Sequence, residues 1–177
     1  MQIFIILHKI EKQKEMSKQN TDNISYKLQR YCLYQARCYK DVQIKYKQLN
    51  GSPEEEKSVL ASLEEEGFFD DLSYAKAFAY GKFTHNQWGK QKIRMGLIAK
   101  GIESPNIENA LDEISQNAYI DCARSICLNK LKSIKSNNKK ELLSKVYNFM
   151  IQRGFYSDDF IPYLKENLNK LVTCTKF

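Results

Sequence analysis

The sequence predicts an all-α protein made of three tandem three-helix repeats that form an elongated, curved array. Three observations favour this fold class. The 177 residues include only 7 glycines and 3 prolines, too few for the frequent tight turns of a β-sandwich or barrel. Helix start signals recur at a nearly constant spacing, and the apolar residues between them follow a helical period. A hydrophobic content of 42% is enough for a thin core in each repeat.

Serine marks the predicted helix starts. Ser52-Pro53 precedes three glutamates, and Ser104-Pro105 repeats the signal 52 residues later. Ser157 follows after another 53 residues and precedes two aspartates. Serine is a favoured N-cap, proline suits the first helical position, and acidic side chains suit the positive end of the helix dipole. We therefore expect each of these serines to cap a helix.

Glycine marks the predicted helix ends. Lys100-Gly101 and Arg153-Gly154 each place a cation in a last helical turn and glycine just after it, the usual pattern of a helix C-terminus. In the first repeat Gly51 stands directly before Ser52, so we expect that turn to be built differently. Asp70 or Asp71 is expected to cap the helix that follows.

Each repeat is expected to open with a helix that buries one apolar stripe. These stripes comprise Ile24, Leu28, Tyr31, Leu33, Tyr34 and Cys38 in the first repeat, Tyr74, Ala77, Phe78 and Phe83 in the second, and Ala123, Ile126, Cys127, Leu131 and Ile134 in the third. The middle helices are expected at Val42 to Leu49, Trp88 to Ala99 and Glu141 to Met150.

These signals divide the chain into repeats at residues 24–69, 70–117 and 118–171, with a C-terminal tail at residues 172–177. Residues 1–23 are interpreted as a disordered or mis-assigned extension, because Met16 opens a polar stretch typical of a protein start. The apolar run Met1 to Leu7 is too short for a membrane span and lacks a cleavage site. No membrane association is expected.

Charge is unevenly distributed along the chain, which carries a net charge of +7. Between Leu72 and Ile102, and again between Cys122 and Lys140, there are six cations and no acidic residue. The acidic residues collect in the third helices. If the repeats stack in register, one edge is basic, which suits a nucleic-acid backbone or a filament coated with acidic protein surface.

The candidate partner-binding or nucleic-acid-binding residues are the cations of this edge. They are Lys82, Lys90, Lys92 and Arg94 in the second repeat, and Lys130, Lys132, Lys135, Lys139 and Lys140 in the third.

Catalytic and metal-binding signatures are missing from the sequence. It contains no glycine-rich phosphate loop, no HExxH and no local nucleophile motif. The five cysteines form no CxxC pair and are interpreted as reduced thiols of a cytoplasmic protein. We expect neither an enzyme nor a cofactor.

The middle of the chain resembles the central signature of RecX-type recombination regulators. The matching segments are Leu63 to Asp71, Tyr74 to Phe78, Trp88 to Arg94 and Leu97 to Ile102, in the family's order and spacing. The resemblance implies tandem three-helix repeats and a regulator without catalytic residues. It also implies a protein that binds the RecA filament on DNA and restrains ATP hydrolysis, strand exchange and coprotease activity. We expect the protein to be a monomer.

The chain departs from the family's signature at one position in the second repeat. Gly96 stands inside a predicted helix, where glycine costs about 1 kcal/mol relative to alanine, so either a neighbour packs very close or the helix is locally weak.

Two alternative functions stay open. The protein could bind DNA directly and read the major groove with the helix from Trp88 to Lys100, or it could be a helical adaptor for another acidic protein.

Overall fold

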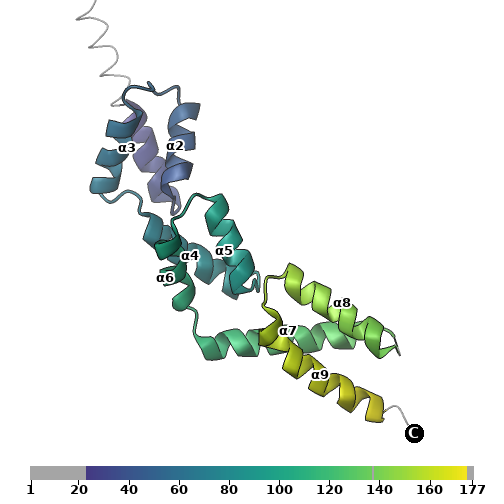
Figure 1. The fold of residues 1–177 in the computed structure, drawn as a ribbon. Coiled ribbons are helices and arrows are strands. Elements are labelled where there is room, and N and C mark those ends of the chain that lie inside the picture. The colour runs from purple at the N-terminus through teal and green to yellow at the C-terminus, as the bar shows by residue number, and fades with distance from the viewer. Residues whose placement is uncertain (1–22, 137, 175–177) are drawn as a thin grey trace, which may run out of the picture. The chain divides into compact units, whose positions relative to one another are not determined.

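The computed structural model describes residues 23–136 and 138–174, and throughout these ranges the regular secondary structure is helical (Figure 1). The all-α prediction is confirmed. The described chain divides into two compact units, with unit 1 ending at Tyr74 and unit 2 beginning at Ala75. The proposed start at Met16 lies outside the described residues, and the three-repeat boundaries stay a prediction. None of the described helices is both long and apolar enough to cross a bilayer.

Unit 1 contains a helix at residues 23–34, α2 (Tyr39–Gln48), α3 (Glu56–Glu65) and the first turn of α4 (Asp71–Thr84). Its core is apolar and includes Ile24, Leu28, Cys32, Val42, Tyr46, Leu60, Leu63 and Phe69.

The predicted stripe of the first helix is only partly correct. Ile24 and Leu28 are buried, but Leu33 is 74% exposed and Tyr34 is 86% exposed. At about 100° per residue, positions 33 and 34 turn away from the face that carries Leu28 and Cys32. Cys38 is buried as predicted, but it lies outside the first helix and is the residue before α2.

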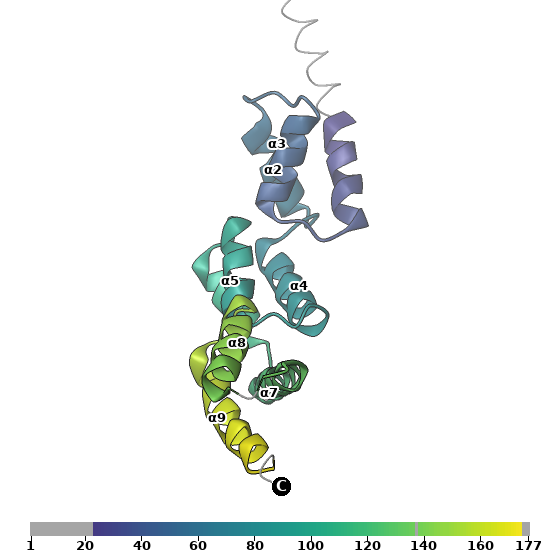
Figure 2. The same ribbon diagram turned by 90° about the vertical axis from the view of Figure 1, so that its right-hand side faces the viewer.

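Unit 2 contains the rest of α4, then α5 (Lys90–Ala99), α6 (Ser104–Asp112), α7 (Gln116–Ser133), α8 (Lys139–Gln152) and α9 (Ser157–Cys174). Helix α5 packs against α6, and α7, α8 and α9 pack against one another. Figure 2 shows α7, α8 and α9 together at the C-terminal end of the described chain. The buried side chains of α7 are Tyr119, Ala123, Ile126, Cys127 and Leu131, so four members of the predicted third stripe are confirmed.

In α4 the predicted stripe is wrong at one position. Ala77 is exposed, whereas Ala75 and Ala79 are buried and Phe78 is half-buried. Positions 75 and 79 are one helical turn apart, and the small side chains there allow close packing.

The serine caps are wrong at all three helix starts. Residues 53–55 form a turn, so α3 begins at Glu56, and the Ser52 hydroxyl bonds the Glu54 carboxylate. Helix α6 includes Ser104 as its first residue, with Glu103 in the cap position. At α9 the carboxylate of Asp159 accepts the N–H of Tyr156 at 2.8 Å, so Asp159 performs the capping. At α9 the carboxylate competes well for this N–H group because the bond is charge-assisted.

The glycine helix ends are confirmed. Gly101 and Gly154 adopt φ of 80° and 85°. After each, the chain folds back to the helix, with Ile102 N–H on Leu97 O at 3.1 Å and Phe155 N–H on Met150 O at 3.2 Å. This is the Schellman arrangement. In the first repeat Asn50 takes the left-handed position, with φ of 58°. Gly51 is there for lack of space, since a Cβ atom at this position would overlap the Tyr46 ring.

Candidate partner-binding surface

The C-terminus of α8 meets the N-terminus of α5 in unit 2. The N–H of Gly89, the residue before α5, donates to Arg153 O at 2.8 Å, and the N–H of Gln91 donates to Gly154 O at 3.0 Å. The first N–H groups and the last carbonyls of a helix have no partner within that helix. Here each end supplies partners for the other, and the positive end of the α5 dipole meets the negative end of the α8 dipole.

Two side chains add to this junction. The Arg153 guanidinium donates to Asn86 O at 3.0 Å, and the Lys92 ammonium donates to Gln152 O at 3.3 Å. A Cβ atom on Gly89 would overlap the backbone of Gly154, and one on Gly154 would overlap the backbone of Lys92. The two backbones therefore approach closely only because both positions are glycine.

Tyr119 of α7 packs against two aromatic side chains next to the junction. Its buried ring lies 6.2 Å from Phe83 and 5.4 Å from Phe155, between centroids. Its hydroxyl donates to Asp159 at 2.7 Å. Burial, together with the carboxylate of Asp159, raises the pKa of Tyr119 well above its ordinary value. The hydroxyl therefore stays protonated and remains a donor.

We expect Tyr119→Phe to lower the free energy of unfolding by about 1 kcal/mol, because one buried hydrogen bond is lost while Asp159 keeps the Tyr156 N–H as a partner. Urea unfolding of both proteins measures the difference. Since the folded pKa of Tyr119 is raised above 10.0, the contribution should be constant at lower pH and should disappear as the pH rises beyond 10.0. A difference that grew with pH above this value would contradict the assignment.

At this junction two aromatic rings each have two cations against them. The Lys82 ammonium lies 4.9 Å and the Lys92 ammonium 4.7 Å from the Trp88 ring centre. Farther along, the Arg153 guanidinium lies 5.0 Å and the Lys130 ammonium 4.8 Å from the Phe149 ring centre. The cation–aromatic row comprises Lys82, Trp88, Lys92, Arg153, Phe149 and Lys130. Ring contacts of this kind attract the cations and restrict their motion.

The row unites candidates that lie far apart in the sequence. Lys82, Lys92 and Lys130 come from α4, α5 and α7, and Lys90 lies nearby with its ammonium 5.2 Å from the Tyr119 ring centre. Arg153 is the member that sequence reasoning missed. The sequence predicts only a helix end at this position, because a cation before glycine carries no signal for a second role.

Arg94 is held apart from the row. Its guanidinium forms a two-pronged ion pair with Glu108 of α6, in which one of the two contacts measures 2.9 Å. A neighbouring carboxylate offsets the charge that Arg94 offers to a polyanion. Arg94 remains a proposed contact for the partner or the nucleic acid. In the structure its ion pair with Glu108 joins α5 to α6.

We expect Arg94→Gln to lower the free energy of unfolding by about 0.5–1 kcal/mol, as measured for exposed ion pairs of good geometry. Glu108→Gln should cost the same, and the double variant should cost no more than either single one. Urea unfolding of the three variants tests this. Additive losses would show that the two side chains act independently.

The remaining candidates lie elsewhere in unit 2. Lys132 and Lys135 are exposed near the end of α7. Lys139 and Lys140, with Lys165, Leu143 and Leu168, line a cleft of about 310 Å³ between α8 and α9. Helix α8 has 14 residues, so this lysine cleft lies about 21 Å along the helix from the Arg153 end.

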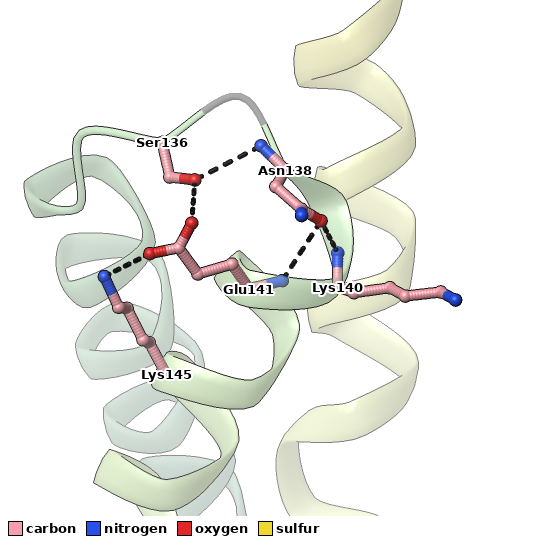
Figure 3. A network of polar contacts seen from close by, with 5 residues as sticks. All are labelled: Ser136, Asn138, Lys140, Glu141 and Lys145. Atoms are coloured by element: carbon pink, nitrogen blue, oxygen red, sulfur yellow. Dashed lines mark hydrogen bonds and ion pairs between the residues drawn. The ribbon is translucent and has the colours of Figure 1, made fainter.

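A polar network fixes the start of α8 beside the lysine cleft (Figure 3). The Asn138 side chain accepts the N–H of Lys140 at 2.9 Å. Glu141 accepts from the Ser136 hydroxyl at 2.6 Å and pairs with Lys145 at 2.5 Å. These contacts hold the pKa of Glu141 below its usual value. The first turn of α8 is thus held at a defined position.

Reactive groups are scarce among the described residues. Burial raises the pKa of the Cys32, Cys38 and Cys122 thiols, and that of Cys127 to about 11, so these thiols stay protonated and poorly nucleophilic. No group of His, Cys, Asp and Glu side chains in the described chain could hold a metal ion.

Comparison with known proteins shows which proteins this chain is similar to. Residues 70–111 match the family model described as "RecX, second three-helix domain". The chain is 30% identical over 131 residues to the regulatory protein RecX of Clostridium acetobutylicum, covering 72% of this chain and 60% of that protein. It is 31% identical over 127 residues to that of Finegoldia magna, covering 71% of this chain and 62% of the relative. The chain therefore spans somewhat less than two thirds of these relatives.

Solved structures share the fold. A crystal structure of a regulatory protein RecX superposes with a TM-score of 0.80 at 22% identity, covering 88% of this chain and 77% of the other. RecX from Lactobacillus salivarius superposes with a TM-score of 0.77 at 18% identity, covering 86% of this chain and 98% of the other. Both support the helical fold predicted from the sequence. The matched second domain and the two relatives show that this chain is similar to proteins of the RecX family.

Proposed function

We propose that this protein is a negative regulator of homologous recombination and DNA repair that works in the cytoplasm. It binds the nucleoprotein filament of a RecA recombinase as a monomer and inhibits its ATPase, strand-exchange and coprotease activities. The observation that carries the proposal is the cation–aromatic row, which holds Lys82, Lys92 and Lys130 on a rigid junction in a chain similar to proteins of the RecX family.

A filament is the target that this arrangement suits best. Fixed cations gain affinity by releasing the counterions condensed on phosphates. The lysine cleft with Lys139 and Lys140 is a second basic group, about 21 Å along α8 from the Arg153 end of the row. Two groups separated on one body bind a long, regular polyanion more tightly than either group alone.

Binding alone is the proposed mode of action. The relatives are named regulatory proteins, and the described cysteines are protonated thiols without a catalytic partner motif. The protein would act by occupying the filament, so no cofactor takes part.

The deciding experiment measures RecA-driven ATP hydrolysis and strand exchange on single-stranded DNA with substoichiometric protein, together with binding to bare DNA. Trp88 is the only tryptophan of the chain and has two ammonium groups against its ring, so its fluorescence reports anion binding at the row. Inhibition of both activities with weaker binding to bare DNA is expected.

Two results would overturn the proposal. Tight, sequence-dependent binding to bare DNA with no inhibition would favour a direct DNA-binding protein. Salt-sensitive binding to another protein without nucleic acid would favour the adaptor.

A further inference from the structure

Two large apolar side chains are exposed on the outer face of α5, although the helix also carries Lys90, Lys92 and Arg94. Met95 is 61% exposed and Ile98 is 52% exposed. At about 100° per residue they lie on the side opposite Ile93 and Leu97, which form the buried face of the helix. Large exposed apolar side chains three positions apart on one helix form a continuous ridge.

This ridge is held in place from three sides. The start of α5 is bonded to Arg153 and Gly154, and its end is closed by the Schellman turn at Gly101. In the middle, a Cβ on Gly96 would lie 2.9 Å from the Phe78 ring, so the ring packs directly on the helix. This close packing accounts for the glycine. The Met95–Ile98 ridge is therefore presented by a helix that cannot readily turn or unwind.

Charge surrounds the ridge on both sides. The sequence of α5 contains no acidic residue. Lys92 flanks the ridge on the side of Trp88, and the Arg94–Glu108 ion pair flanks it on the other side. Because Arg94 is already paired, a matching surface would have an apolar recess with an acidic group near Lys92. DNA phosphates gain little from a thioether or an aliphatic chain, whereas Met adapts well to apolar recesses of proteins.

We propose that the Met95–Ile98 ridge docks into an apolar, acid-bordered recess on a protein subunit of the filament, while the cation–aromatic row contacts its phosphates. The inference rests on the proposed function and divides it between two chemically different surfaces. It also argues against α5 as a reader of bases, because its outermost side chains include two without hydrogen-bonding groups.

The test replaces both ridge residues by glutamine, in Met95→Gln/Ile98→Gln. Affinity for RecA filaments, measured by co-sedimentation, should fall about tenfold or more, as expected for apolar residues at the centre of an interface. Affinity for bare single-stranded DNA, read from Trp88 fluorescence, should stay within about twofold of the parent protein. The matched control is Leu33→Gln/Tyr34→Gln in unit 1, which removes two side chains that are 74% and 86% exposed and should change neither affinity.

The outcomes separate the two proposals. Unchanged filament affinity of the ridge variant, in a protein that does inhibit RecA, would overturn the ridge alone. Equal losses on bare DNA and on filaments would also overturn it, because the ridge would then serve DNA binding. A parent protein that does not bind RecA filaments at all would overturn the proposed function and the ridge together. Circular dichroism of each variant checks that the helices are intact.

Discussion

Gly89→Ala is expected to lower the free energy of unfolding of unit 2 by about 3 kcal/mol, at the upper end of the cost of overpacking. The backbone of Gly89 has φ of −73° and ψ of 161°, which alanine adopts without strain. The cost therefore comes from contact alone. The new Cβ would overlap the carbonyl of Gly154 and the nitrogen of Phe155, and backbone atoms cannot move aside as a side chain does.

The junction must open to relieve this overlap. Opening breaks the bonds from Gly89 to Arg153 and from Gln91 to Gly154, and it moves Lys92 away from the Gln152 carbonyl. The variant should therefore also lose affinity for the filament. Urea unfolding followed by Trp88 fluorescence measures the change within unit 2.

Gly81→Ala is the matched control. Gly81 lies in α4 and has no neighbour within 4 Å of a new Cβ. Alanine there should stabilise the protein by up to about 1 kcal/mol through helix propensity. If both variants changed the free energy of unfolding in the same direction, the close contact at Gly89 would not be the cause.

Lys82→Gln/Lys92→Gln is expected to weaken DNA binding in a manner that depends on salt. Each phosphate contact contributes about 0.7 to the slope of log affinity against log salt on single strands. Loss of two contacts should reduce that slope by about 1.4. Inhibition of RecA should fall at the same time, because both cations lie on the Trp88 ring in the row.

The control removes the same charge elsewhere. Lys27→Gln/Lys57→Gln lowers the net charge equally, and both residues are exposed in unit 1. Anisotropy of a labelled oligonucleotide over a range of salt concentrations compares the two pairs. Equal reductions in slope would mean that net charge matters and that the row has no special role.

Local signals in the sequence were sufficient for some parts of this structure. The helix ends at Gly101 and Gly154 were predictable because a left-handed residue after a helix depends on a few neighbouring positions. The all-helical class was predictable from composition and period, and the candidate cations of unit 2 from the gaps in acidic residues. These properties depend only on residues that are close together in the sequence.

Other features required the folded chain. Leu33 and Tyr34 are exposed because the direction of a helix face depends on what packs against it. Likewise, Arg94 meets Glu108 and Arg153 caps α5 across 14 and about 64 positions of sequence.

The sequence by itself determined that the chain is helical, that helices end at Gly101 and Gly154, and which segments are basic, because these depend on residue type and local spacing. Only the tertiary structure decided that Lys82, Lys92, Arg153 and Lys130 form one row and that Arg94 stands apart. The physical reason is the close approach of two glycine backbones, at Gly89 and Gly154, which sets the distances between side chains from four helices.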